Sequence, residues 1–315
     1  MSPLTVDTNN PKTAVLLLAH GSPSAPEEVP EYLKYVTSGR PLPQNVIDEI
    51  THRYALVGSS PLTRWTLRQS YQLADLLHVP VYVGMRNWKP FIPDVVRTMC
   101  ADGVKRAVVI CMAPQNSRTS VGLYRRALQG EKDVPFAIEF VVSWHDHPLL
   151  IKSFAERLRD DWPKACNQAE AKLPIIFTAH SVPERTITEG DPYQAQAHRT
   201  AELVAQEGAL TPEDWTFAFQ SQGVSGGPWI GPTVEETVVT LKQKGSRGVF
   251  IQPIGFVCDH VEVLYDIDIA FREFAEKNGL RLWRAESLND SLLLTQALAD
   301  LVHSQLRSSA VGSSV

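Results

Sequence analysis

Short apolar runs alternate along the chain with longer segments in which apolar residues recur every three or four positions. The short runs suit strands buried on both faces of a parallel sheet, and the longer segments suit helices with one apolar face. In the first half this pattern predicts strands near 13–19, 79–84, 106–113 and 136–143, and helices near 27–37, 44–55, 64–77, 90–102 and 119–129. In the second half it predicts strands near 173–179, 214–220, 247–254 and 281–285, and helices near 194–208, 232–244, 260–277 and 291–306. An α/β fold follows from this alternating order.

Two stretches in the two halves resemble each other: AVLLLAHGSP at 14–23 and PIIFTAHSVP at 174–183. The match aligns His20 with His180, although two unrelated buried strands could also look alike. An internal repeat of this length predicts two related Rossmann-like domains, each a mostly four-stranded parallel sheet flanked by helices. Since open α/β sheets bind ligands at the carboxyl ends of their strands, we expect both histidines in equivalent loops at those ends.

The domain boundary is expected at a helix near 147–162, because the apolar pattern of the first sheet stops before it and the second sheet starts after it. The first domain then spans 13–150 and the second spans 151–308. A last helix could cross back to the first domain. The polar or small residues of 1–12 and 309–315 predict disordered tails.

Composition narrows the class of protein. Hydrophobic residues make up 43% and charged residues 21% of the chain, which is ordinary for a globular protein. The formal net charge of −5 and the lack of a long basic cluster argue against a nucleic-acid partner. The apolar runs are too short for a transmembrane segment and no secretory signal precedes them, so we expect a cytoplasmic protein. The scattered Cys100, Cys111, Cys166 and Cys258 form no CxxC pair, which argues against an iron–sulfur cluster or a disulfide framework.

The densest group of ionisable residues is GFVCDHVEVLYDID at 255–268. On a helix Glu262 and Asp266 share one face, where like charges repel each other. A capping box from Asp259 to Glu262 is one interpretation, but it leaves Asp266 unexplained. The other interpretation combines these carboxylates with His180 into a site for iron(II), cobalt or zinc, which imidazole and carboxylate ligands suit.

A second group, His145-Asp146-His147, has the look of a metal-binding pair. It lies where the first domain ends and a helix begins. A capping or solvated-loop role therefore explains it better than metal binding.

Several segments together resemble the ferrochelatase family, whose members insert ferrous iron into a porphyrin. In the second half they are FTAHSVPER at 177–185, GDPY at 190–193, FQSQG at 219–223, PWIGP at 228–232 and PIGFVCDHVEVLYDID at 253–268. In the first half they are LLLAHGSP at 16–23, RYALVGSSPL at 53–62, YVGMRNWKPFI at 82–92 and NSRTSVGLYRRA at 116–127. Because these motifs are independent and occur in the family's order, the signal is specific and spans most of the chain.

The resemblance implies a chelatase-type fold with a porphyrin in the cleft between the domains. His180 and Glu262 match the family's metal-binding pair, and Asp266 matches part of an acidic path for metal or protons, so these three are the implied catalytic residues. The implied porphyrin-binding residues are His20, Arg53, Tyr54, Ser60, Tyr124 and Trp229. Substrate Fe²⁺ is the only metal implied, with no cofactor. Transient contact with other enzymes of haem synthesis is a further expectation.

Four positions depart from the family pattern. His20 stands where many soluble bacterial members have Tyr or an apolar residue, and Thr37 stands where some have a propionate-binding Arg, for which Arg40 could substitute. The segment GSSPL is one residue shorter than usual, and Ala270 replaces an acid, which shortens the carboxylate path.

The short connection between Val36 and Tyr54 has no longer apolar lip of the kind found in membrane-docking members. It resembles the soluble members that act on coproporphyrin III, so we expect that substrate and coproheme as product. Three alternatives stay open: a protoporphyrin IX ferrochelatase, a cobalt or sirohydrochlorin chelatase, and a non-catalytic porphyrin- or haem-binding protein.

Overall fold

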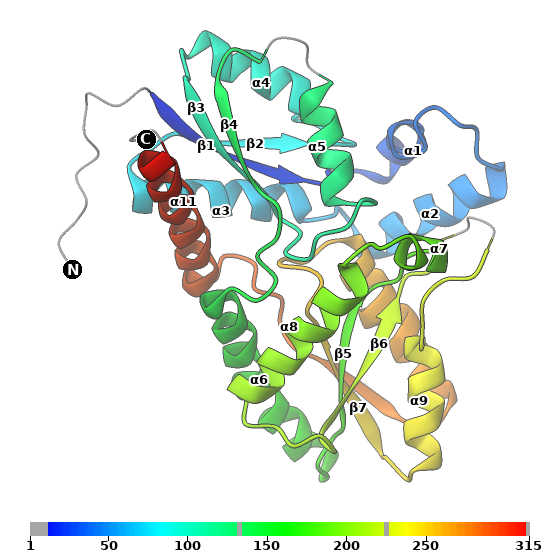
Figure 1. The fold of residues 1–315 in the computed structure, drawn as a ribbon. Coiled ribbons are helices and arrows are strands. Elements are labelled where there is room, and N and C mark those ends of the chain that lie inside the picture. Colours follow the sequence, from blue (N-terminus) through cyan, green and yellow to red (C-terminus); the bar gives the residue numbers. More distant parts are fainter. Residues whose placement is uncertain (1–11, 131–133, 224–226, 313–315) are drawn as a thin grey trace.

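Each half of the chain forms one four-stranded parallel sheet with helices around it. The computed structural model describes residues 12–130, 134–223 and 227–312, and its two sheets form two lobes (Figure 1). The strands are β1 (Thr13–Ala19), β2 (Val81–Met85), β3 (Arg106–Cys111), β4 (Ala137–Val141), β5 (Ile175–His180), β6 (Trp215–Gln220), β7 (Gly248–Pro253) and β8 (Arg281–Arg284). The helices of the first lobe are η1 (Pro26–Glu28), α1 (Val29–Val36), α2 (Gln44–Val57), α3 (Leu62–Leu77), α4 (Ile92–Ala101) and α5 (Val121–Gln129). The remaining helices are α6 (Pro148–Ala169), α7 (Glu184–Thr188), α8 (Tyr193–Glu207), α9 (Val234–Gln243), η2 (Glu262–Phe271), α10 (Arg272–Lys277) and α11 (Leu292–Gly312).

The two sheets have the same strand order. The first runs β2-β1-β3-β4 and the second β6-β5-β7-β8, so the first strand of each half lies second in its sheet. β1 and β5 are therefore equivalent strands, as the sequence repeat predicts. His20 follows the end of β1 and His180 is the last residue of β5. The predicted fold class is confirmed.

The element boundaries agree with the sequence pattern to within a few residues at most positions. The short helix α7 was not predicted, and the helix expected over 27–37 is divided into η1 and α1. α6 continues to Ala169, past the predicted end at 162, even though Pro163 lies inside it. The segment expected as one helix over 260–277 is a π-helix, η2, followed by the short α10. α11 continues to Gly312, beyond residue 308, where a tail was expected to begin; residues 1–11 and 313–315 of the two expected tails lie outside the described residues.

One apolar cluster runs through both lobes. It includes Leu17 of β1, Phe154 of α6, Phe177 of β5 and Leu298 of α11. α11 packs against α3 and α6 and reaches β3, so the last helix of the chain does cross back to the first sheet (Figure 1). This shared core fixes the two sheets relative to each other, because separating them would expose its apolar surface to water.

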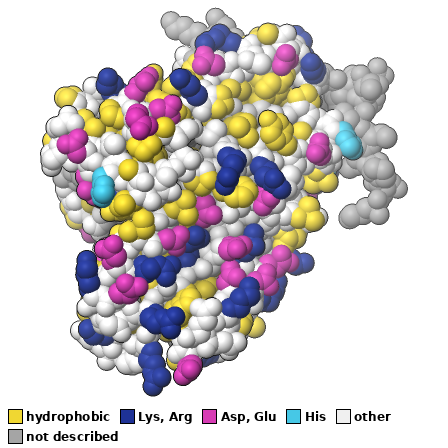
Figure 2. Space-filling view, turned by 180° about the vertical axis from the view of Figure 1, so that it is seen from behind, with side chains coloured by type: hydrophobic (Ala, Val, Ile, Leu, Met, Phe, Trp, Pro, Cys, Tyr) yellow, Lys and Arg dark blue, Asp and Glu magenta, His cyan; other side chains and the backbone are white. Residues whose placement is uncertain are grey.

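The surface carries both signs of charge. Figure 2, seen from behind, shows acidic and basic side chains interspersed across this face, with apolar side chains between them. Within the described ranges, no helix combines the length and apolar character needed to span a membrane. The cytoplasmic location stays a prediction.

Candidate active site

Side chains from both lobes meet at the carboxyl ends of the sheets. His20 follows β1, Arg86 follows β2, His180 ends β5, and the loop after β7 leads to Glu262 at the start of η2. Their electrostatic influence on one another shows that they share one region, since His20 and His180 both act on the pKa of Glu262. The parallel direction of all strands places these four side chains at one edge of each sheet.

Two glycines allow the loops to approach each other. Gly21 has a φ of +83°, and a Cβ there would lie 2.8 Å from the backbone nitrogen of Trp88. A Cβ on Gly255 would lie 2.9 Å from the Cβ of Ala179, in the residue before His180. A side chain at either position would push a site loop away from its neighbour, so glycine is required by space at both positions and by backbone conformation at Gly21.

His180 presents one ring nitrogen to Glu262. Its Nδ1 donates to the backbone carbonyl of Ser181, which leaves a lone pair on Nε2. Nε2 lies 3.6 Å from Oε2 of Glu262. This separation is longer than a hydrogen bond and fits two atoms that each lie about 2 Å from one metal ion.

The surroundings of His180 hold it from two sides. The hydroxyl of Tyr193, in the GDPY segment, donates to the backbone carbonyl of His180 at 2.9 Å. The ring of Trp229 lies with its centroid 6.4 Å from that of the imidazole, tilted by 51°. Both contacts restrict the histidine without using Nε2, so this atom stays directed at Glu262.

Glu262 carries its charge at neutral pH. Burial alone raises the pKa of its carboxyl, but three nearby imidazoles outweigh burial and hold the pKa below its ordinary value: those of His180, His260 and His20. The backbone N–H of Glu262 donates to Nδ1 of His260 at 3.1 Å, which places the proton of a neutral His260 on Nε2. Burial lowers the pKa of His260, so it is this neutral form that accepts the bond.

The capping-box interpretation of Asp259 and Glu262 is wrong. Val261 is the N-cap residue of η2 and no side chain caps it. The Asp259 carboxylate instead accepts hydrogen bonds from Ser287 and Asn289. These partners lie about 30 positions further along the chain, so local sequence spacing does not reveal them.

Asp266 faces a cleft of about 530 Å³ beside the His180–Glu262 pair. Ser221 Oγ donates to its carboxylate, and Nη1 of Arg53 lies 4.0 Å from Oδ1. Burial raises the pKa of Asp266 to about 6, and the negative charge of Glu262 adds to this effect. Ala270 also lines the cleft, so its wall is apolar at the position where the family pattern has an acid.

His20 lies on the side of the site that the first lobe forms. Its Nε2 accepts a hydrogen bond from Nδ2 of Asn87 at 3.0 Å and lies 3.0 Å from the hydroxyl oxygen of Tyr32. Burial, followed by the positive charge of Arg86, lowers the pKa of His20 to about 4. The side chain is therefore neutral at pH 7, and its ring is held in place by two polar neighbours.

Tyr54 and Tyr124 line the same side of the site from different helices. The Tyr54 hydroxyl lies 2.8 Å from Oγ of Ser22, and burial raises the pKa of Tyr54 to about 12. Burial also raises the pKa of Tyr124, over whose ring the guanidinium of Arg86 lies at 5.8 Å. Both phenols are thus neutral hydrogen-bonding groups.

Arg86 is a site residue that the sequence analysis did not single out. It is half-buried, its Nε is sealed from water without a hydrogen-bond partner, and it makes no ion pair within the described part of the chain. Burial lowers its pKa, as expected for a cation without a nearby carboxylate. Its place directly after β2, at the carboxyl edge of the sheet, was the signal that could have identified it.

The remaining candidates lie at different distances from this centre. The guanidinium of Arg53 lies 4.9 Å from the ring of Tyr265 and so joins the Asp266 cleft. Ser60 is buried just before α3, and its hydroxyl has no hydrogen-bond partner in the residues described. Its contacts do not connect it to His180 or Glu262.

His147 serves the start of α6, as expected, whereas Nδ1 of His145 lies 2.8 Å from Oγ of Ser143. Nδ1 of His147 accepts from the backbone N–H of Leu149 at 3.3 Å and caps the helix, and its Nε2 lies 3.2 Å from Asp300. Within ranges 12–130, 134–223 and 227–312, no group of three or more His, Cys, Asp or Glu side chains is arranged to hold a metal ion. The four cysteines are free thiols.

The chain is similar to known proteins along most of its length. The ferrochelatase family model matches residues 12–306. A ferrochelatase of Acidobacterium capsulatum is 53% identical over 94% of this chain and 95% of its own length. A coproporphyrin III ferrochelatase of Geobacillus sp. is 33% identical over 94% of this chain and 98% of its own length. The solved structure of SirB from Bacillus subtilis with Fe³⁺ covers 93% of this chain and 95% of its own, with a TM-score of 0.57 at 12% identity.

Proposed function

The chain belongs to the ferrochelatase family and is a lyase that inserts iron into a porphyrin, and from this premise we propose that its substrate is coproporphyrin III and its product coproheme. The His180–Glu262 pair is the observation that carries the proposed site. Nε2 of His180 and Oε2 of Glu262 lie 3.6 Å apart at the carboxyl edge of the second sheet. Nitrogen and oxygen donors together suit ferrous iron.

In this proposal Nε2 of His180 and the carboxylate of Glu262 receive ferrous iron, which is a substrate and not a resident cofactor. The hydrogen bond from Nδ1 of His180 to a backbone carbonyl supports this assignment, because it leaves Nε2 as the ring nitrogen that faces Glu262. The ionised state of Glu262 supports it as well, since a carboxylate must lose its proton to bind a metal.

Iron insertion releases two pyrrole protons. Nε2 of His180 and the carboxylate of Glu262 can each accept one only after the iron has passed from them to the pyrrole nitrogens. Asp266 lies one step further along the cleft wall, and its pKa of about 6 allows it to gain and lose a proton close to neutral pH. We therefore assign Asp266 to the path by which protons leave or metal arrives.

The porphyrin ring would lie against the side of the site that the first lobe forms, with His20, Tyr54, Tyr124 and Trp229 beside it. Arg53 offers a guanidinium at the Asp266 cleft, and its side chain is 40% exposed. Arg86 is the stronger candidate for a substrate carboxylate, because a half-buried cation without an anionic partner gains most from one. Ser60 stays a proposed propionate partner on the resemblance alone.

Two observations favour coproporphyrin III over protoporphyrin IX. The connection between α1 and α2 covers only residues 37–43, is mostly exposed, and adds no apolar lip to the site. Arg40 lies on it and is exposed, three residues after Thr37, where some family members have a propionate-binding Arg, and its Nε donates to the Thr37 carbonyl. Four carboxylates match such a polar rim better than the apolar vinyl edges of protoporphyrin IX.

Anaerobic assays with Fe²⁺ test the proposal. The purified chain should convert coproporphyrin III to coproheme, followed by the change in the porphyrin absorption bands, without an added cofactor. A preference for protoporphyrin IX in the same detergent-free buffer would replace the substrate assignment. Loss of the preference would leave iron insertion itself untouched.

A further inference from the structure

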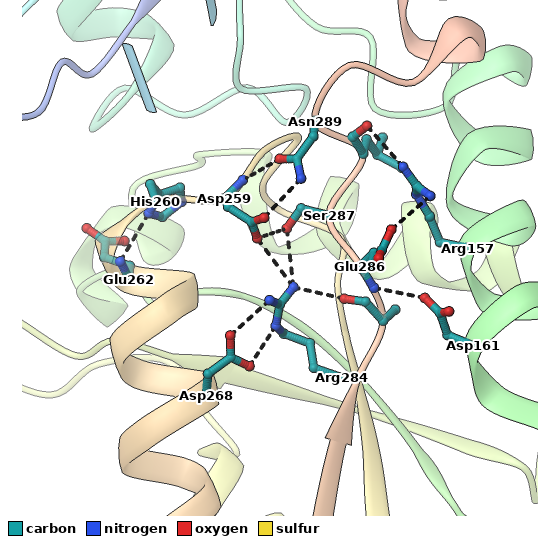
Figure 3. Close-up of polar contacts among 12 residues, drawn as sticks. Arg157, Asp161, Asp259, His260, Glu262, Asp268, Arg284, Glu286, Ser287 and Asn289 are labelled. Atoms are coloured by element: carbon teal, nitrogen blue, oxygen red, sulfur yellow. Dashed lines mark hydrogen bonds and ion pairs between the residues drawn. The ribbon is translucent and has the colours of Figure 1, made fainter. Parts of the chain in front are cut away.

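Two carboxylates of the segment 255–268 take no part in the proposed iron site. Asp259 precedes Glu262 by one short turn, and Asp268 follows it within η2. Both carboxylates point toward one guanidinium, that of Arg284 at the end of β8 (Figure 3).

The guanidinium of Arg284 binds the carboxylate of Asp268 in a bidentate manner. Nε lies 2.8 Å from Oδ1 and Nη2 lies 2.9 Å from Oδ2. Two parallel bonds of this kind define the orientation of both groups as well as their distance. Only 12% of the Arg284 side chain and 25% of the Asp268 side chain are exposed, so water competes weakly for these bonds.

The same guanidinium reaches the loop that precedes η2. Nη1 of Arg284 lies 3.4 Å from Oδ1 of Asp259 and donates to the Ala285 carbonyl at 2.9 Å. Asp259 also accepts from Ser287 Oγ at 2.7 Å and from Nδ2 of Asn289 at 2.9 Å. The loop is therefore fixed by several bonds to the segment after β8.

Glu262 lies between these two anchor points. The loop through Asp259 is held on its N-terminal side, and η2 is held through Asp268 on its C-terminal side, by the same arginine. We propose that Arg284 is a positioning residue for iron insertion, which sets the placement of Glu262 relative to His180 by binding one aspartate on each side of it. This inference rests on the proposed role of Glu262 in receiving iron.

A π-helix makes such an anchor useful. A π-helix, with i→i+5 hydrogen bonds, is rare and occurs frequently at functional sites. At its start η2 has one side-chain hydrogen bond, from the N–H of Glu262 to Nδ1 of His260. The bidentate bond to Asp268 holds the helix from outside at a second point.

Three variants separate positioning from general stability. Arg284→Lys keeps the charge but loses the bidentate bond, Arg284→Gln loses both, and Asp268→Asn removes the bidentate partner while Asp259 still pairs with Arg284. Assays are run at a temperature well below the melting temperature of each variant. We expect kcat for Fe²⁺ insertion to fall by about tenfold to a hundredfold, and KM for the porphyrin to change less than about twofold. Arg284→Lys should retain more activity than Arg284→Gln.

Glu286→Gln is the matched control. Glu286 pairs with Arg157 at 3.2 Å in the same segment, but its side chain is 73% exposed and makes no contact with η2 (Figure 3). Its kinetics should equal those of the wild type. Unchanged kcat in all three test variants would overturn the positioning role. A fall in apparent kcat that only matches the fraction of folded protein lost would overturn it as well, because unfolding removes active enzyme and leaves KM unchanged.

A double-mutant cycle ties the effect to Glu262. In a Glu262→Gln background, residual activity is measured over long incubations. Adding Asp268→Asn should lower kcat little or no further, because the position of residue 262 no longer matters once its carboxylate is gone. The same fold-loss in both backgrounds would mean that Arg284 and Asp268 act independently of Glu262, and the inference would be rejected. Wild-type activity of the Glu262→Gln single variant would instead remove the proposed role of Glu262, which is a distinguishable result.

Discussion

The Nε2 of His180 lies 3.6 Å from Oε2 of Glu262, although His180 ends β5 and Glu262 begins η2, far apart in the sequence. Their meeting depends on the close approach of Gly255 to Ala179, which brings the loop after β7 against the end of β5. The geometry gives a pair of donors that are not bonded to each other. This arrangement supports the proposal that both receive iron.

His180→Ala should abolish iron insertion without unfolding the protein. The side chain ends a strand and is partly exposed, so its loss removes a ligand and little packing. Anaerobic turnover should fall by at least about a thousandfold while the melting temperature changes by a few degrees. Turnover close to that of the wild type would reject the role of His180 in receiving iron.

Asp266→Asn should lower kcat by roughly tenfold to ten-thousandfold, with little change in porphyrin affinity. Because its pKa is about 6, Asp266 loses its proton as the pH rises through this value, and kcat of the wild type should rise there. The rise should be absent in Asp266→Asn. An identical pH profile for both proteins would show that Asp266 is only part of the cleft wall.

Thermal stability offers an independent check on Asp266. The pKa of the Asp266 carboxyl is raised in the folded protein from its ordinary value of 3.8. Its contribution to stability is therefore fully present below pH 3.8 and is lost as the pH rises through about 6. Asp266→Asn should therefore melt at a higher temperature than the wild type at pH 8 and show little gain at pH 4. Equal melting temperatures at both values would contradict the raised pKa.

Coproporphyrin III should be used with a higher kcat/KM than protoporphyrin IX. A divinyl edge would leave polar groups of the rim unpaired, at a cost of about 1–3 kcal/mol for each buried group. Side-by-side kinetics in one detergent-free buffer measure this difference. Arg53→Ala should raise KM for the tetracarboxylate more than it lowers kcat, if the residue only holds substrate.

Arg86→Met should raise KM for coproporphyrin III by about tenfold or more, since a charge-assisted hydrogen bond contributes roughly 1.5–3 kcal/mol. kcat should change much less. Arg125→Met is the control, because Arg125 is exposed next to Tyr124 and stacks on Phe140 outside the site. Equal KM values in the two variants would exclude Arg86 from carboxylate binding.

Sequence periodicity predicted the strands well because both sheets are parallel and buried. β1 reads TAVLLLA, and all but its first residue are fully or almost fully excluded from water, so an apolar run maps directly onto a strand. The similar run at β5 predicted that the two sheets are equivalent. Local chemistry also sufficed at His147, whose capping bond joins residues two positions apart.

Features that depend on distant contacts were not predictable in the same way. Asp259 has the spacing of a helix cap, but its carboxylate instead binds Ser287, Asn289 and Arg284. The π-helical turn of η2 has no signature in hydrophobic spacing. The unpaired state of Arg86 is visible only when all neighbouring carboxylates are known.

The return of α11 to the first sheet has a consequence for synthesis on the ribosome. Side chains of β1 and β3 such as Leu17 and Ile110 share their apolar cluster with Leu298 and Val302, which are translated after the whole second sheet. One face of the first sheet is therefore incompletely covered when the first lobe emerges, and α11 can close it only after the second sheet has been translated. Until then that face is a surface for chaperones or for aggregation, and the two halves of the site gain a common frame only in the final step.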